Sequence, residues 1–329
     1  MKCDRCGLVF KRYRDSINYY YNNNLHFCPK CDYKNLTFRS NGERELGSEI
    51  QKFYDGDIRF NKHIATFEAD IIIPDKKLAI DYNGVYYHSE LFKTSNAHKE
   101  KKHAIEEAGY SFIQVWEDDW HNPIKKEIIL SRIKSKLGLS EKIYARKCKV
   151  VELTERKEIV NAVKFLKNNH LQGNAPSSRK FALLYNDEIV ELATFGKSRK
   201  LISGNTDKIE LIRLCTKQGY NIVGGFSKLI KFALKELNVD SFISYADNDW
   251  INYENNGYLK SGFSLIKETA CNYWWAKDGI RENRMKYTKD KLCSMGFDKS
   301  KTETEIMNSL GYYKVYGSGN LLFEYRQIN

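Results

Sequence analysis

The sequence opens with two pairs of cysteines whose spacing constrains the first part of the chain before any hydrophobic core is considered. Cys3 and Cys6 form one C-x-x-C pair, and Cys28 and Cys31 form a second. Four thiolates placed in this way can hold one Zn²⁺ tetrahedrally, and they leave no position for a water, so such a zinc is structural. A module this small needs its metal to fold. The sequence therefore predicts a zinc ribbon over residues 1–38.

The alternative for the four cysteines is a redox role. Gly7 follows the first pair and Pro29 lies inside the second, and both are typical of zinc knuckles. The stretch between the pairs is basic and aromatic. It either lies on DNA phosphates and bases or packs against the rest of the protein, and the sequence favours neither.

Length and charge bound the rest of the chain. A chain of 329 residues is long enough for two ordinary domains beside the small module. The net charge of +12 implies an acidic partner, for which nucleic acid is the leading candidate. There is no signal peptide and no apolar stretch of the length that spans a membrane, so we expect a soluble, cytoplasmic protein with no membrane partner.

The remaining four cysteines are scattered singly, as expected in a reducing compartment where they act as small buried hydrophobes: Cys148, Cys215, Cys271 and Cys293.

The hydrophobic pattern predicts two α/β domains with a boundary near residue 140. The first domain, 39–140, is expected to hold helices at 42–54, 91–108 and 123–137 and strands at 66–73, 78–82 and 111–116. The second domain, 150–329, is expected to hold helices at 156–168 and 225–237 and strands at 180–185, 189–195, 208–215, 241–245, 272–277 and 312–325. The predicted fold class is therefore α/β and multidomain.

Hairpin geometry brings two carboxylates together in the first domain. If residues 74–77 form the turn, Asp70 lies opposite Asp81, and Glu68 and Asn83 share that face. Like charges directly across a hairpin repel each other, and a divalent cation resolves the conflict. Oxygen ligands suit Mg²⁺ or Mn²⁺. The alternative is that each aspartate faces solvent and pairs with one of the many lysines.

The segment from about 49 to 120 resembles the PD-(D/E)XK nuclease fold, in particular the very-short-patch-repair endonucleases and the EDxHD homing endonucleases. The resemblance implies that Glu49 is the acid of the first helix, Asp70 and Asp81 are the metal-binding acids, and His88 is the histidine that follows the Asn83-Gly84 turn. It further implies Mg²⁺-dependent cleavage of DNA.

The sequence departs from the broader fold where that fold has a lysine two residues after the second acid, because Asn83 occupies the position. We expect His88 to move the proton instead, since imidazole titrates near neutral pH. His98 stands on the next helix, either as a spare acid or base or as a surface residue. Glu117, Asp118 and Asp119 are a solvated loop or, less favoured, metal ligands.

The second domain resembles the GNAT acyltransferase fold, including relatives that modify phage DNA. The resemblance is carried by a strand ending at Cys215, the pair Gly224-Gly225 before a helix, and the segments 244–247 and 257–263. In that fold the strand-to-helix loop and the helix N-terminus hold the pyrophosphate of acyl-CoA, which makes acyl-CoA a possible cofactor here.

Five basic residues close to helical spacing follow, and they are expected either to contact a phosphate backbone or to form a solvated face: Arg281, Arg284, Lys286, Lys289 and Lys291. Taken together, the sequence predicts a homing-type or phage-encoded endonuclease that cuts double-stranded DNA, with structural Zn²⁺ and catalytic Mg²⁺, acting in the cytoplasm of a bacterial host if phage-encoded. The alternatives are a DNA-modifying acyltransferase and a non-catalytic DNA-binding protein.

Overall fold

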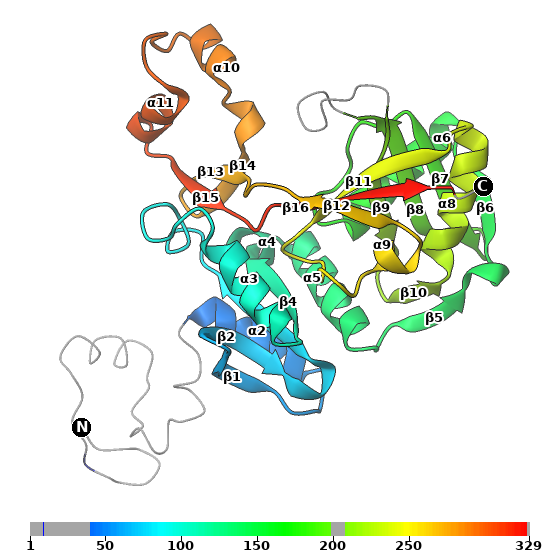
Figure 1. The fold of residues 1–329 in the computed structure, drawn as a ribbon, viewed down its shortest axis with the longest axis horizontal. Coiled ribbons are helices and arrows are strands. Elements are labelled where there is room, and N and C mark those ends of the chain that lie inside the picture. The colour runs from blue at the N-terminus through cyan, green and yellow to red at the C-terminus, as the bar shows by residue number, and fades with distance from the viewer. Residues whose placement is uncertain (1–8, 10–39, 199–207, 328–329) are drawn as a thin grey trace.

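The computed structural model describes residues 9, 40–198 and 208–327 (Figure 1). The predicted zinc ribbon, with Cys3, Cys6, Cys28 and Cys31, lies outside the described residues and stays a prediction. Within the described part, no helix has both the length and the apolar composition that crossing a bilayer requires.

The N-terminal unit, residues 41–136, is a sheet of four strands in the order β1-β2-β3-β4 with helices on both faces. β1, β2 and β3 are antiparallel neighbours, and β4 runs parallel to β3. Its elements are α2 (Asn41–Gln51), β1 (Arg59–Ile64), β2 (Phe67–Ile73), η1 (Pro74–Lys76), β3 (Leu78–Asn83), α3 (Ala97–Glu107), β4 (Ser111–Trp116), α4 (Glu117–His121) and α5 (Pro123–Lys136).

The predicted hairpin forms with the predicted register. Ile73 pairs with Leu78 and Ile71 with Ile80. The turn is a short 3-10 helix that starts at Pro74 and ends at Lys77, which adopts a left-handed conformation with φ 45°. Apolar residues of β2 and β3 pack against α2 and α5 on one face and against α3 on the other. The face that carries Asp81 is therefore covered by α3 rather than open to solvent.

The C-terminal unit, residues 141–326, is built on a sheet of seven strands in the order β12-β16-β11-β9-β8-β7-β6. α8 packs on one face and α6 on the other. The sheet is mixed and covered by helices, which confirms the α/β class that the sequence predicted. Its elements are β5 (Glu141–Tyr144), η2 (Ala145–Lys147), β6 (Lys149–Glu152), α6 (Arg156–Asn169), β7 (Arg179–Tyr185), β8 (Glu188–Lys197), β9 (Ile209–Thr216), β10 (Tyr220–Val223), α8 (Gly225–Leu237), β11 (Ser241–Asp247), α9 (Gly257–Lys260), β12 (Ser264–Glu268) and β16 (Asn320–Arg326).

An insertion, residues 273–316, separates β12 from β16. Two of its helices, α10 and α11, stand away from the large sheet (Figure 1). Its elements are β13 (Tyr273–Lys277), β14 (Ile280–Asn283), η3 (Arg284–Lys286), α10 (Lys289–Ser294), α11 (Glu303–Ser309) and β15 (Tyr313–Tyr316). The five basic residues predicted to share a helical face therefore fall on a strand, a 3-10 turn and a short helix. Their spacing reflects a hairpin followed by a turn, and the helical expectation is corrected.

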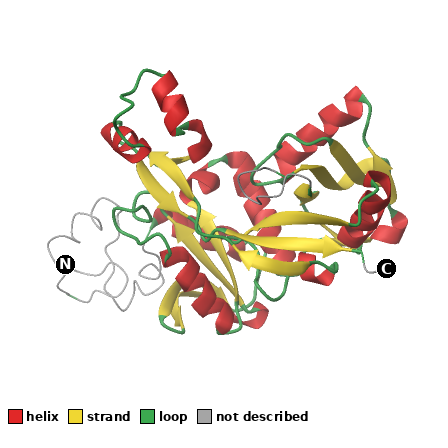
Figure 2. Ribbon diagram, turned by 45° about the horizontal axis from the view of Figure 1, so that its top comes forward, coloured by secondary structure: helices red, strands yellow, loops and turns green. Residues whose placement is uncertain are grey.

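The two units are in direct apolar contact. Leu171 and Trp250 of the C-terminal unit pack in the same cluster as Ile129 and Ile133 of α5 and Leu46 of α2. Figure 2, with strands in yellow and helices in red, shows the two sheets with helices between and around them. The boundary predicted near residue 140 therefore lies between two sheets whose units pack against each other.

Candidate active site

Asp70 and Asp81 lie next to each other on the β2–β3 hairpin, one residue beyond its last backbone pair, Ile71 with Ile80. The N–H of Tyr82 donates to Asp70 Oδ2 at 2.7 Å, and the N–H of Asp70 donates to Asp81 Oδ1 at 3.4 Å. Each carboxylate thus continues the ladder with a side-chain oxygen. Asp81 is 2% exposed, while Asp70 is partly buried. The hairpin places the two predicted acids together, as its turn length requires.

Negative charge exceeds positive charge around this pair. Burial raises the pKa of Asp70 well above its usual value, and the nearby charges of Asp81 and Glu43 raise it further. Lys101, from α3, forms an ion pair with Asp81 and is the nearby cation that opposes the shift. Asp70 therefore lies in the field of two other carboxyl groups and one ammonium group.

The acid that α2 contributes to this environment is Glu43. Glu49, which the resemblance implied, instead forms ion pairs with Lys52 at 2.9 Å and Lys126 at 3.7 Å. Six positions along a helix turn a side chain by about 240°, so the two glutamates cannot share a face. Glu43 is 4% exposed and accepts a hydrogen bond from Asn61 at 2.8 Å. Glu43 was not singled out from the sequence.

Two histidines form a hydrogen-bonded chain beside the carboxylates. His88 Nδ1 lies 3.3 Å from His98 Nε2, and His98 Nδ1 lies 2.5 Å from Gln114 Oε1. Burial lowers the pKa of His88 to about 3 and also lowers the pKa of His98. Both rings are therefore neutral at neutral pH. The charge of Lys101 contributes to both shifts, which places the histidines and the carboxylates in one electrostatic environment.

The chain of hydrogen bonds continues into the C-terminal unit. Gln114 Nε2 donates to Asp249 Oδ1 at 3.2 Å and to Ser318 Oγ at 2.6 Å. Glycine at position 317 lets Trp274 and Asp249 lie close to the backbone, because a Cβ there would be 2.9 Å from Trp274 and 3.2 Å from Asp249 Oδ2. No local pattern in the sequence pointed to these residues.

The donor set suits a hard cation. Mg²⁺ is commonly held by one or two carboxylates while it keeps several waters, and Asp70 and Asp81 supply such a pair. A cation there would relieve the repulsion that raises the pKa of Asp70. Among the described residues, no group of three or more His, Cys, Asp or Glu side chains is arranged to enclose a metal. Asp70 and Asp81 would therefore supply two oxygen ligands of such a cation.

The loop that carries His88 exposes aromatic and apolar side chains. Tyr86 is 47% exposed, Tyr87 69%, Leu91 57% and Phe92 53%. The ring of Tyr86 lies 5.3 Å from that of Tyr87 and 5.2 Å from that of Phe92, centroid to centroid. Large exposed apolar groups gathered beside a buried polar site mark a surface that contacts another molecule.

Of the five basic residues of the insertion, Arg281 is used inside the protein. Its guanidinium lies over the rings of Trp116 and Trp274, at 4.4 and 4.7 Å, and pairs with Asp118 at 2.8 Å and Asp119 at 2.9 Å. The acids after β4 thus bind an arginine.

The other four basic residues differ in how they are used. Arg284 lies over the ring of Tyr273, and Lys286 pairs with Glu282. Lys289 and Lys291 make hydrogen bonds in exposed positions.

Side chains from both units gather near a split between two strands of the large sheet. β9 and β11 pair only at Ile243–Glu210 and Ser244–Leu211 and separate beyond these positions. Arg132 of α5 reaches this region: its guanidinium lies 4.5 Å from the ring of Trp250, and Asp247, Cys215 and Tyr258 act on its charge.

Gln172 Nε2 also donates to Asp247, at 3.3 Å. Burial lowers the pKa of Arg132 and raises that of Asp247 to about 6.

The loop that follows β9 is engaged as well. The N–H of Gln218 donates to Asn169 Oδ1 at 2.9 Å, and the N–H of Gly219 donates to Ser131 Oγ at 3.0 Å. Residues 220–223 form β10, which pairs in parallel with β5. A buried carboxyl group, Glu191, lies against Gly225 at the start of α8. The N–H groups of Gln218 and Gly219 are thus already bound, and β10 pairs with β5 immediately before Gly224. The carboxyl group of Glu191 beside Gly225 would also repel a pyrophosphate at the start of α8.

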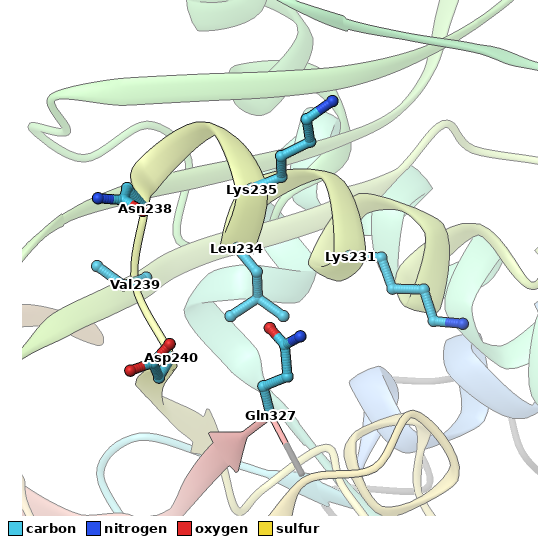
Figure 3. A pocket seen from close by; sticks show the side chains of 7 residues that line it. All are labelled: Lys231, Leu234, Lys235, Asn238, Val239, Asp240 and Gln327. Atoms are coloured by element: carbon cyan, nitrogen blue, oxygen red, sulfur yellow. The ribbon is translucent and has the colours of Figure 1, made fainter. Parts of the chain in front are cut away.

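A surface hollow of about 350 Å³ lies at the other end of α8 (Figure 3). Its lining comprises Lys231, Leu234, Lys235, Asn238, Val239, Asp240 and Gln327. The side chains of Lys231 and Lys235 point away from each other in Figure 3. The hollow contains none of the carboxylates or histidines described above.

Comparison with known proteins gives partial likenesses. No protein family matches the sequence, and no curated protein does. The catalytic domain of homing endonuclease I-Bth0305I is 25% identical, with 30% of this chain and 95% of that chain covered and a TM-score of 0.26.

Acetyltransferases recur among the similar structures. The ribosomal-protein-S18-alanine N-acetyltransferase of Escherichia coli is 11% identical, with 55% of this chain and 96% of that chain covered and a TM-score of 0.32. A histone acetyltransferase HPA2-related protein of Corynebacterium glutamicum is 9% identical, with 56% and 98% covered and a TM-score of 0.33. Scores of this size leave the function to be argued from the site.

Proposed function

We propose that the protein is a Mg²⁺-dependent endonuclease that hydrolyses phosphodiester bonds in double-stranded DNA. The observation that carries the proposal is the pair Asp70 and Asp81, held together at the end of a hairpin with Lys101 and the neutral His88 in the same electrostatic environment. Two carboxylates, a cation and a neutral imidazole are the groups that phosphodiester hydrolysis requires.

Each residue has a distinct part in this proposal. Asp70 and Asp81 would hold the Mg²⁺, which when bound polarises the phosphodiester and lowers the pKa of a water. His88 accepts a proton from the attacking water or returns one to the leaving oxygen, because its ring is neutral at neutral pH. Lys101 keeps a positive charge beside Asp81 and can stabilise charge that develops on the phosphate.

DNA is the substrate that the surface supports best. The net charge of +12 favours a polyanion. The exposed rings beside His88 offer bases a stacking surface. Arg284, Lys286, Lys289 and Lys291 offer phosphate contacts on the insertion, whereas Arg281 is buried at 6% exposure. A zinc ribbon at residues 1–38 and a homing-type target belong to the same proposal.

A DNA-modifying acyltransferase is the second candidate. The observation in its favour is the GNAT-like order of the seven-stranded sheet. Two observations weigh against it: Arg132 lies beside the strand split, and the N–H groups of Gln218 and Gly219 after β9 are already hydrogen-bonded. We therefore prefer the nuclease, with the C-terminal unit as its support.

The test is cleavage of a plasmid that carries the genomic DNA flanking the gene, with Mg²⁺ or with EDTA. Asp70→Asn and His88→Ala are compared with the wild type and with Asp57→Asn, a control whose aspartate makes an exposed ion pair with Arg59. We expect discrete Mg²⁺-dependent cuts that disappear in Asp70→Asn and His88→Ala and persist in Asp57→Asn. Uncut DNA, or cuts that survive both site changes, would remove the assignment.

A further inference from the structure

The hydrogen-bonded chain beside the carboxylates crosses from one unit to the other. We infer that Asp249, acting through Gln114 and His98, fixes the tautomer of His88 so that its Nε2 is the bare nitrogen that accepts a proton. Asp249, Gln114 and His98 are positioning residues in this inference. The consequence of this inference for catalysis rests on the proposed nuclease function. The assignment of the two tautomers does not depend on that function.

Asp249 determines which way the amide of Gln114 points. Its carboxylate accepts hydrogen bonds from Gln114 Nε2 at 3.2 Å, from Trp116 Nε1 at 3.0 Å and from the N–H of Ser318 at 2.9 Å. Each of its oxygens accepts from an obligatory donor, Oδ1 from the backbone N–H of Ser318 and Oδ2 from Trp116 Nε1, so both oxygens act as acceptors. The end of Gln114 that faces Asp249 must therefore be its NH₂ group.

The oxygen of Gln114 then points the other way. Gln114 Oε1 lies 2.5 Å from His98 Nδ1 and accepts from Asn83 Nδ2 at 3.1 Å. Because an amide oxygen only accepts, His98 must carry its proton on Nδ1. The ring of His98 is neutral, since burial lowers its pKa, so its Nε2 is bare. Asn83, which stands in the position of the missing lysine, provides the second donor to this oxygen.

The last step reaches the reactive residue. His98 Nε2, a bare nitrogen, lies 3.3 Å from His88 Nδ1. The contact is favourable only when His88 carries its proton on Nδ1 and donates it. The neutral ring of His88 is left with a bare Nε2. Every member of the chain between Asp249 and His98 is at most 5% exposed, so water cannot substitute for a missing partner.

The first test uses the full-length wild-type protein with ¹⁵N-labelled histidine. We expect the ring-nitrogen signals of His88 and His98 at neutral pH to show a protonated Nδ1 and a bare Nε2 in both residues. His88→Ala and His98→Ala assign the signals. A protonated Nε2 on His88 would overturn the inference. This reading needs no DNA cleavage, so the inference and the proposed function can fail separately.

The second test compares two changes at the same junction. Gln114→Met removes the acceptor of His98, and we expect a mixture of tautomers on both rings and roughly a 10²-fold loss of cleavage. Ser318→Ala removes one partner of Gln114 but leaves Asp249, and we expect unchanged tautomers and cleavage within about 3-fold of the wild type. Wild-type tautomers in a folded Gln114→Met protein would contradict the inference. If that protein does not fold, the wild-type spectrum alone decides.

Discussion

The hairpin of the N-terminal unit and the strand split of the C-terminal unit both bury charge, but they bury it differently. At the hairpin, burial raises the pKa of Asp70, and the charges of Asp81 and Glu43 raise it further against the opposing charge of Lys101. At the split, Arg132 lies on Trp250 beside Asp247, whose charge is of opposite sign. Like charges meet at the hairpin, whereas opposite charges meet at the split. Uncompensated charge, more than fold resemblance, separates a candidate site from a supporting structure.

The largest expected change in stability tests whether the apolar cluster that joins the two units holds both of them together. Trp250→Ala removes a ring that is 6% exposed and shared by both units. We expect a loss of about 3–5 kcal/mol of unfolding free energy, typical of deleting a buried aromatic side chain. Urea unfolding is followed by far-ultraviolet circular dichroism and tryptophan fluorescence.

Coincident urea transitions by both probes would agree with one shared core. Two transitions, with the N-terminal unit as stable as before, would show that the units do not depend on each other. Tyr253→Ala, at a residue that is 39% exposed, is the control and should change stability by less than about 1 kcal/mol.

The next effect tests the charge balance at the hairpin. Lys101→Met removes the cation beside Asp81, and we expect cleavage to fall by roughly 10²–10³-fold, because the group that can stabilise charge on the phosphate is lost. Lys99→Met, on the same helix, removes an ion pair with Glu268 and should stay near wild-type activity. The two rates are measured on one plasmid substrate. Equal rates for the two variants would remove Lys101 from the site.

A smaller effect concerns Glu191, whose carboxyl group faces Gly225. Burial raises its pKa from 4.5 to about 8, and its Oε2 has no hydrogen-bond partner among the described residues. Because the folded pKa is above the unfolded one, the stabilisation is complete below pH 4.5 and is lost as the pH rises through 8.

Relative to Glu191→Gln, the wild type should lose on the order of 2 kcal/mol between pH 5 and pH 8. Glu188→Gln, at an exposed position of the same strand, is the control and should follow the wild-type profile. The measurement is urea unfolding at several pH values, and parallel profiles for wild type and Glu191→Gln would contradict the assignment.

The last prediction is that acetyl-CoA and CoA do not change the thermal stability of the protein. Acetyl-CoA at 100-fold over a dissociation constant would add about 2.7 kcal/mol of stability. We expect no shift in the melting temperature of the full chain with acetyl-CoA or CoA, because the split and the loop after β9 are engaged. A saturable shift in the melting temperature would favour the acyltransferase function. It would also show that the C-terminal unit, like the hairpin, contains a ligand site.

The sequence was sufficient where a local rule determined geometry. A four-residue turn sets the register of the β2–β3 hairpin, so the meeting of Asp70 and Asp81 could be predicted. Glu43 and Glu49 could not be separated, because helix phase depends on which face packs inward. The polar edge strand β1 was missed because its burial pattern does not alternate.

The partners of Gln114 were beyond local rules altogether. Asp249 and Ser318 lie 135 and 204 positions away from it, and only the packing of the two units brings them near. A mixed sheet was predictable from the order of strands and helices, whereas the place of Arg132 beside its split depends on α5, from the other unit.

The bond between Gln114 and Asp249 also orders events in time. A ribosome that adds roughly 5–20 residues per second needs about 7–27 s to travel from one to the other, so the nascent N-terminal sheet exists for a time without the carboxylate that accepts from Gln114. A chain released before position 249 would carry Asp70 and Asp81 but no carboxylate to turn the oxygen of Gln114 toward His98. Under the proposed function, such a partial product would hold both acids without an oriented His88.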